Sequence, residues 1–136
     1  MDRNKSYHKG AKRFENGTVP FYCVAGLKAA LEIINSVGIE TVAKHNHGLI
    51  QQLIEGIEDQ DLTTITPHEP ERRGALINVR VEEKKDLKKI VEILEEKYKV
   101  TITARFGGLR FSAQLYNTEK NIQTALSSLK EVLAMV

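Results

Sequence analysis

Residues 103–118 read TARFGGLRFSAQLYNT and bring two arginines, a pair of glycines and a helix start together in one short stretch. Apolar and polar residues alternate on both sides of Gly107-Gly108, as they do in two half-buried strands joined by a turn. If the two glycines form the primed turn that glycine favours, Arg105 lies directly opposite Arg110 on one face of the hairpin.

This pair of arginines predicts a bound anion. Two like charges paired directly across a β-ladder destabilise it, by up to roughly 1 kcal/mol. A site that keeps Arg105 and Arg110 together therefore indicates an anion between or above them. The alternative is that both arginines line a solvated sheet face, where charged side chains normally lie.

The composition excludes several classes of function. The chain has 136 residues, a net charge of +2 and a single cysteine, Cys23. Basic residues are mostly interleaved with acids, so nucleic acid is not the expected partner. One cysteine cannot form an internal disulfide, and no zinc-ligand spacing occurs, which predicts a reducing cytoplasm and no metal site. No secretory leader and no run of membrane-spanning length is visible, so we expect no membrane partner.

Hydrophobic periodicity predicts the remaining elements. They are a helix that begins at Thr18-Val19-Pro20 and stops at Gly38, a helix over 39–58, a short edge strand over 62–66, a strand over 75–81, a helix over 86–98, and a last helix capped by Asn117 or Thr118. This order is typical of an α+β fold, a helical hairpin followed by a small, mostly antiparallel sheet with helices packed on one face. We expect the first two helices to bury each other, and the sheet face that bears the arginines to stay uncovered.

Other reactive side chains give weaker signals. His45 and His47 lie two residues apart on a predicted helix and point to different sides, so they cannot chelate one ion together. His68 lies in a polar loop and is expected to be solvated. Cys23 is interpreted as a small buried hydrophobe rather than a reactive thiol. No catalytic residue is predicted.

A second candidate anion site precedes the first helix. Gly17 permits close backbone approach, Thr18 offers a hydroxyl, and the following helix presents free N–H groups at the positive end of its dipole. These features suit a phosphate group. A Gly-Thr pair before a helix is also an ordinary helix cap, and the pattern alone favours a cap over a phosphate site.

Two motifs, one near each end of the chain, resemble a known family when taken in order. The residues concerned are Arg13-Phe14-Glu15 with Gly17-Thr18, Gly26-Leu27, Ala29-Ala30-Leu31, Gly38-Ile39, Leu109-Arg110-Phe111-Ser112 and Tyr116-Asn117-Thr118-Glu119. They resemble the C-terminal part of class V aminotransferases, the fold-type I pyridoxal-phosphate enzymes that include cysteine desulfurases and isopenicillin N epimerase-like proteins. By this resemblance, residues 1–12 are a flexible N-terminal arm and residues 13–136 are the small C-terminal domain.

The resemblance also implies roles for single residues. Arg110 is similar to the arginine that binds the substrate α-carboxylate, for which a planar bidentate fork is well suited. Arg105 is similar to the other strand-end arginine of the family. Thr18 is similar to the threonine that reaches a cofactor phosphate across a dimer interface, with Gly17 supporting it, so the resemblance implies a homodimer.

Two departures limit what the chain is expected to do alone. The family's Schiff-base lysine and the aspartate that holds the pyridine nitrogen lie in a large domain upstream, and only twelve residues precede Arg13. We therefore expect the isolated chain to bind no pyridoxal phosphate and to need a large domain, in cis or in trans, for activity. In desulfurases of this family, a catalytic cysteine lies on a loop before the carboxylate-binding arginine. The corresponding residues 106–109 of this chain contain no cysteine, so the resemblance favours an epimerase-like or aminotransferase-like member.

Two other functions are compatible with the sequence. The chain could be a stand-alone, non-catalytic module that uses its arginines to bind an amino acid or another anion. It could also be a protein-interaction domain that dimerises through apolar surface which a large domain would otherwise cover.

Overall fold

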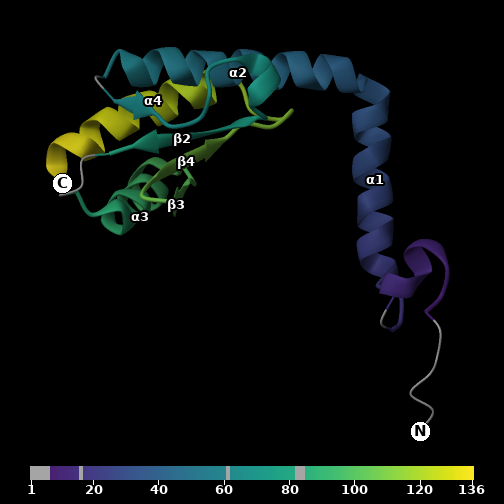
Figure 1. The fold of residues 1–136 in the computed structure, drawn as a ribbon. Helices are drawn as coiled ribbons and strands as arrows, with labels where there is room; N and C mark the ends of the chain where they lie inside the picture. The colour runs from purple at the N-terminus through teal and green to yellow at the C-terminus, as the bar shows by residue number, and fades with distance from the viewer. Residues whose placement is uncertain (1–6, 16, 61, 82–84) are drawn as a thin grey trace, which may run out of the picture. The chain divides into compact units, whose positions relative to one another are not determined.

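The computed structural model describes residues 7–15, 17–60, 62–81 and 85–136. The chain divides into two compact units, Met1–Val37 and Gly38–Val136, and each is described by itself. The first unit contains a short 3-10 helix, η1 (Gly10–Phe14), and the helix α1 (Phe21–Val37) (Figure 1). The carbonyl of Pro20 accepts the N–H of Val24 at 3.1 Å, so α1 begins just after the proline.

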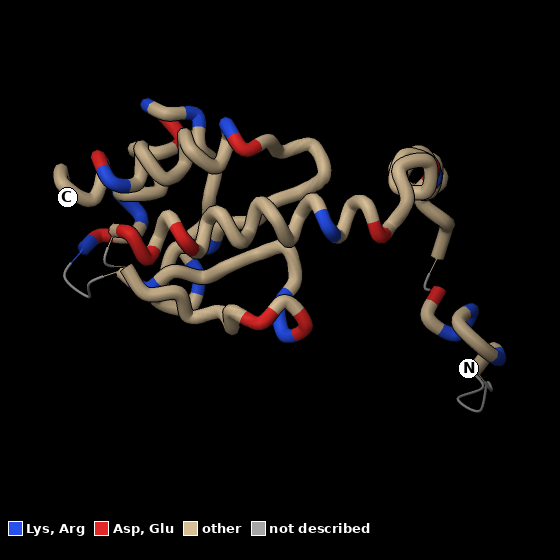
Figure 2. Tube along the Cα trace, turned by 90° about the horizontal axis from the view of Figure 1, so that it is seen from above, with Lys and Arg blue, Asp and Glu red and all other residues tan. Residues whose placement is uncertain are grey.

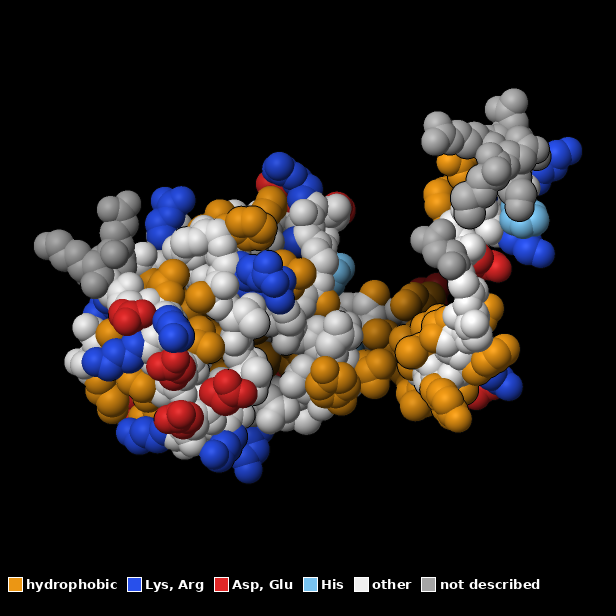
Figure 3. Space-filling model, turned by 90° about the horizontal axis from the view of Figure 1, so that it is seen from below, with side chains coloured by type: hydrophobic (Ala, Val, Ile, Leu, Met, Phe, Trp, Pro, Cys, Tyr) orange, Lys and Arg blue, Asp and Glu red, His pale blue; other side chains and the backbone are white. Residues whose placement is uncertain are grey.

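The apolar side chains of α1 are exposed except that of Ile34, which is half-buried. No residue of this helix is buried, and Figure 3 shows hydrophobic side chains gathered over it. The second helix buries its apolar stripe within its own unit, whereas the expected mutual burial of the first two helices would join two units and stays a prediction. The interpretation of Cys23 as a buried hydrophobe is wrong, since this cysteine is exposed.

The second unit confirms the α+β class. In chain order its elements are α2 (Ile39–Glu58), β1 (Thr63–Thr64), η2 (Pro70–Arg72), β2 (Leu76–Arg80), α3 (Leu87–Tyr98), β3 (Thr103–Arg105), β4 (Gly108–Ser112) and α4 (Glu119–Met135). The four strands form one sheet in the order β1-β2-β4-β3, and every neighbouring pair is antiparallel. The strand predicted at an edge, β1, lies at an edge.

The core lies on one face of this sheet. Side chains alternate along β2 and β4, so that Ile77, Val79, Leu109 and Phe111 are buried on the same side. Helix α2 contacts α4, β1 and β2, and α3 contacts α4 and β3, so the three helices cover that face. No helix of the described part of this unit contacts the opposite face, which carries the side chains of even-numbered residues in β2 and β4.

Local signals in the sequence explain where the helices of this unit begin. The Asp86 carboxylate accepts the N–H groups of Lys88 and Lys89 at the start of α3. Of the two cap candidates for α4, the structure selects Thr118, which forms a reciprocal capping box with Asn121. Figure 2 shows positive and negative residues interspersed along the described trace. Among the described residues no single helix is long and apolar enough to cross a membrane, and only α1 and α2 taken together meet that test, by length and composition.

Candidate functional site

The hairpin between β3 and β4 turns one residue earlier than the sequence predicts. Its two turn residues are Phe106 and Gly107, with φ angles of 52° and 72°, and both are positive as a primed turn requires. Arg105 pairs with Gly108 across the ladder. The prediction that Arg105 faces Arg110 directly is therefore wrong.

Close packing against β2 explains this register. A Cβ atom on Gly108 would lie 2.5 Å from both the Asn78 Oδ1 atom and the Val79 carbonyl oxygen. Any side chain at position 108 would clash with these two atoms of β2. Gly108 is therefore used for this close contact within β4, and it does not lie in the turn. Phe106 takes the turn position instead, with a side chain that is 92% exposed.

The two arginines still share one face of the sheet, as diagonal neighbours. Arg110 lies between Asn78 of β2 and Thr103 of β3, its direct partners in the two ladders. Arg105 pairs with Gly108, which precedes Arg110 by two residues in β4. The side chains of Arg105 and Arg110 therefore point to the same face of the sheet. The diagonal placement separates the two charges more than direct pairing would.

Arg110 is the more constrained of the two arginines. It is half-buried, whereas Arg105 is exposed. The Arg110 Nε atom is buried and has no hydrogen-bond partner among the described residues. A buried guanidinium donor that is left unpaired is destabilising, and an oxyanion is the acceptor that matches it best.

Asn78 is a site residue that the sequence analysis missed. Its Nδ2 atom donates to the Arg105 carbonyl at 3.0 Å and so holds the end of β3 against β2. Its Oδ1 atom is buried without a partner among the described residues. The available signal was weak, since an asparagine at an outward position of a strand is usually only a solvated side chain.

Gly17 and Thr18, the candidate phosphate-binding residues, lie in the first unit and are exposed. A Cβ atom on Gly17 would meet nothing within 4 Å, so no close approach within the described residues requires glycine there. The first main-chain bond of α1 uses the N–H of Val24. The N–H groups of the preceding first turn therefore point outward without helical partners, as an anion site requires.

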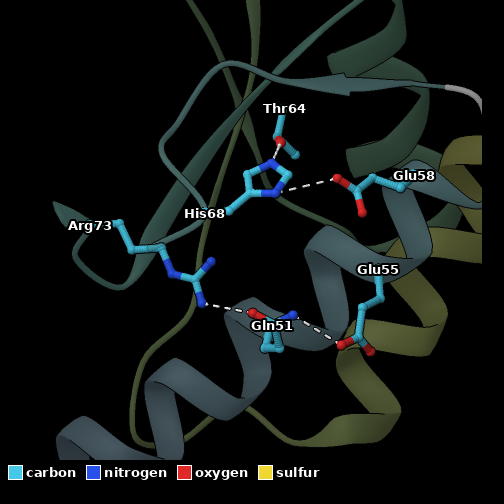
Figure 4. Close-up of polar contacts among 6 residues, drawn as sticks. All are labelled: Gln51, Glu55, Glu58, Thr64, His68 and Arg73. Carbon is cyan, nitrogen blue, oxygen red and sulfur yellow. Dashed lines mark hydrogen bonds and ion pairs between the residues drawn. The ribbon is translucent and has the colours of Figure 1, made fainter. Parts of the chain in front are cut away.

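A second polar cluster joins α2 to the loop before β2 (Figure 4). Arg73 is only 8% exposed, and its Nη2 atom donates to Gln51 Oε1 at 3.0 Å. Gln51 in turn donates to Glu55 at 3.0 Å, so a neutral amide links the guanidinium to a carboxylate. This cluster fastens the loop to α2, and sequence reasoning missed it because Arg73 lies among other loop charges.

His68 belongs to the same region. It hydrogen-bonds to Thr64, and its Nδ1 atom lies 3.5 Å from Glu58 Oε1 (Figure 4). Its side chain remains half exposed, so the expected solvation holds only in part. His45 lies 2.9 Å from the Asn117 carbonyl and helps to fix the turn before α4. Among the described residues no group of three potential metal ligands occurs.

Comparison with known proteins identifies the family. The sequence pattern of the family described as Aminotransferase class-V matches residues 1–126. The chain therefore belongs to the class V aminotransferase family. The assignment agrees with the resemblance seen in the sequence.

Individual relatives are much longer than this chain. A probable cysteine desulfurase of Streptomyces coelicolor is 34% identical over 76 residues, which cover 55% of this chain and 18% of the relative. An uncharacterized protein of Schizosaccharomyces pombe is 26% identical over 139 residues, which cover 97% of this chain and 30% of the relative. The chain thus corresponds to a fragment of the proteins that it matches.

Solved structures share the fold. The apo structure of a cysteine desulfurase from Thermococcus onnurineus NA1 superposes with a TM-score of 0.81 at 19% identity, covering 93% of this chain and 34% of that one. An alanine–glyoxylate aminotransferase from Nostoc sp. superposes with a TM-score of 0.72 at 21% identity, covering 91% of this chain and 34% of that one. At these identities the likeness establishes the fold alone.

Proposed function

We propose that the chain is the small C-terminal part of a pyridoxal-phosphate-dependent class V enzyme and binds the α-carboxylate of an amino-acid substrate through Arg110. The half-buried guanidinium on the uncovered sheet face, with its unpaired Nε donor, is the observation that carries this proposal. The names of the matched relatives include cysteine and alanine, which are both α-amino acids. Arg105, on the same face, adds positive charge to the site.

The described residues fit one end of the cofactor. Thr18 and the free N–H groups at the start of α1 suit a phosphate group, and Gly17 leaves space around the backbone. When bound, pyridoxal phosphate supplies an electron sink for the amino-acid α-carbon. We propose that the lysine and the ring partner for the cofactor come from a large domain, in cis or in trans.

The exposed stripe of α1 supports the need for a partner. Large side chains such as Phe21, Tyr22 and Leu27 are exposed on it, and a soluble protein rarely leaves such a stripe open to water. A large domain or a second copy of the chain would cover it. A homodimer and a cytoplasmic location remain predictions.

The type of reaction is a finer proposal. The turn between β3 and β4 holds only Phe106 and Gly107 and offers no thiol, and the single cysteine of the chain lies in α1. A desulfurase that attacks sulfur from this hairpin would need such a thiol. We therefore favour aminotransferase-like or isopenicillin N epimerase-like chemistry for the completed enzyme.

Titration of the isotope-labelled chain with L-alanine tests the role of Arg110. We expect saturable NMR shifts at the amides of β3 and β4, and binding about tenfold weaker in Arg110→Gln, because a charge-assisted bond is lost. Arg80→Gln is the matched control, since it removes an equal charge from the same face. Equal weakening by both variants, or no saturable shift in the unmodified chain, would contradict the proposed role.

A separate measurement tests whether this chain anchors the cofactor by itself. After incubation with pyridoxal phosphate and borohydride, mass spectrometry of the isolated chain should find no adduct on a specific lysine. A stable, stoichiometric adduct would show that the chain anchors the cofactor by itself.

A further inference from the structure

A cavity of about 360 Å³ lies within the Gly38–Val136 unit, away from the arginines of the open sheet face. It lies on the helix-covered side of the sheet, since Leu53 of α2, Phe111 of β4 and Ala125 of α4 line it. Phe111 and Arg110 are neighbours in β4 and point to opposite faces. The cavity is therefore distinct from the proposed amino-acid site.

The cavity has an apolar floor and a polar rim. Its floor consists of side chains that are buried in the core, namely Leu53, Ile102, Phe111, Ile122 and Ala125. Its rim is exposed or half-buried and carries hydroxyl, amide and ammonium groups. Small-molecule sites in proteins have this composition, and their volumes begin at about 300 Å³.

Two asparagines at the rim are fixed in orientation. The Asn117 Oδ1 atom accepts the N–H of Gln114 at 2.9 Å, and the Asn121 Oδ1 atom accepts the N–H of Thr118 at 2.9 Å. Because a main-chain N–H needs an acceptor, each amide oxygen must take that place. The Nδ2 amino groups are then left as donors that a ligand can use.

The remaining rim groups favour the same kind of ligand. The Lys99 ammonium uses one donor on the Glu96 carbonyl at 2.9 Å and keeps two more. Thr101 adds a hydroxyl at the start of the segment that leads into β3. Of the described residues that line the cavity, none is an aspartate or a glutamate. The rim is thus rich in donors and positive charge, above an apolar floor.

We propose that this cavity is a second ligand site, which takes a small carboxylate with a compact apolar body. The apolar body lies on the floor, and the carboxylate accepts hydrogen bonds from the asparagine amides, the Thr101 hydroxyl and the Lys99 ammonium. The site does not depend on Arg110 or on a large domain, since all of its described lining residues belong to the second unit and Arg110 is not one of them.

Benzoate is a suitable probe, with benzyl alcohol as its neutral counterpart. Titration of the isotope-labelled full chain should give saturable NMR shifts at Thr101, Ser112 and Asn121, with a Kd on the order of 1 mM for so small a ligand. Benzyl alcohol should bind at least severalfold more weakly, because it lacks the charged acceptor.

Three variants separate this site from the arginine face. Thr101→Val removes one rim hydroxyl while keeping the shape of the side chain, and should weaken benzoate severalfold. Thr103→Val is the same substitution two residues further on, outside the cavity lining, and should leave benzoate binding unchanged. Arg110→Gln should also leave it unchanged, although the same variant weakens L-alanine binding at the other site.

Several results would overturn the proposal. One is the absence of saturation up to about 50 mM benzoate, well above the expected Kd. Another is a set of shifts centred on Arg105 and Arg110 that disappears in Arg110→Gln, which would place the carboxylate on the open face. Equal affinity for benzoate and benzyl alcohol would refute the carboxylate class, and equal weakening by Thr101→Val and Thr103→Val would refute the location.

Discussion

Two consecutive helices, α1 and α2, differ sharply in what their apolar stripes contact. Both stripes follow helical periodicity, and the helices have 17 and 20 residues. Seven residues of α2 are buried, five of them isoleucine or leucine, whereas no residue of α1 is. The difference teaches that amphipathic periodicity identifies a helix face that must pack against something. Whether the packing partner belongs to the same chain depends on the rest of the fold.

For α2, the cover comes from its own unit. Ile50, Leu53 and Ile57 are almost fully buried, and the helix contacts α4, β1 and β2. Within its own unit the stripe of α1 has no such cover. The two solved structures described above are each about three times longer than the part matched here, and we propose that the corresponding rest of the enzyme supplies that cover.

The largest expected effect contrasts one apolar residue from each helix. Ile50 is fully buried, and Ile50→Ala should lower the free energy of unfolding by about 2–5 kcal/mol through lost burial and the cavity that remains. Leu31 of α1 is 48% exposed, and Leu31→Ala should change it by no more than about 0.5 kcal/mol. Urea denaturation followed by circular dichroism measures both. Similar losses in the two variants would show that α1 is packed in solution.

A smaller effect of opposite sign is expected at two helical glycines. Gly26 lies in α1, where an added Cβ meets nothing within 4 Å, so Gly26→Ala should stabilise the helix by about 0.5–1 kcal/mol. Gly56 lies in α2, where the Cβ would come within 2.3 Å of Leu126 Cδ1. Gly56→Ala should therefore destabilise the fold by about 1 kcal/mol, because the displaced leucine outweighs the gain in helix propensity.

Thermal unfolding of the two alanine variants checks this pair directly. The sign of the shift matters more than its size, since the two substitutions are chemically identical. A stabilising Gly56→Ala would mean that the side chain of Leu126 moves aside freely, and that α2 and α4 pack more loosely than the structure indicates.

Much of the second unit could be predicted from the sequence. The bounds of α2 agree with the prediction at both ends, and those of α3 agree to within one residue. These elements are encoded by local periodicity and by capping residues such as Asp86 and Thr118. Local patterns also placed β1 at an edge, through the proline that follows it.

What the sequence could not provide depends on contacts between distant residues. The turn lies one residue earlier than predicted because Gly108 packs closely against Asn78 and Val79, in a strand about thirty residues away. Either of two adjacent glycines suits a turn, and only that packing chooses between them. In the same way, the contact of Arg73 with Gln51 and the exposure of Cys23 follow from what each element packs against, which no local pattern contains.

The smallest expected effect concerns a polar link between α3 and α4. Lys97 donates to the Tyr98 hydroxyl at 2.8 Å, and that hydroxyl donates to Glu131 at 2.6 Å. The hydrogen bond to Tyr98 raises the pKa of Lys97 above its ordinary value of 10.5, and the charge of Glu131 adds to the rise. A raised pKa means that the folded state holds the proton more tightly than the unfolded state does. The associated stability is therefore fully present below pH 10.5 and is lost as the pH rises through the folded-state pKa.

Tyr98→Phe removes the hydroxyl and should return the pKa of Lys97 toward 10.5, as measured by NMR titration of its side chain. Because the lysine is fully exposed, the midpoint of urea denaturation at neutral pH should barely move. A marked loss of stability would contradict the comparison of the two helices, since it would mean that surface polar links, rather than covered apolar stripes, hold this unit together. An unchanged Lys97 pKa would show that the hydrogen bond is not formed in solution.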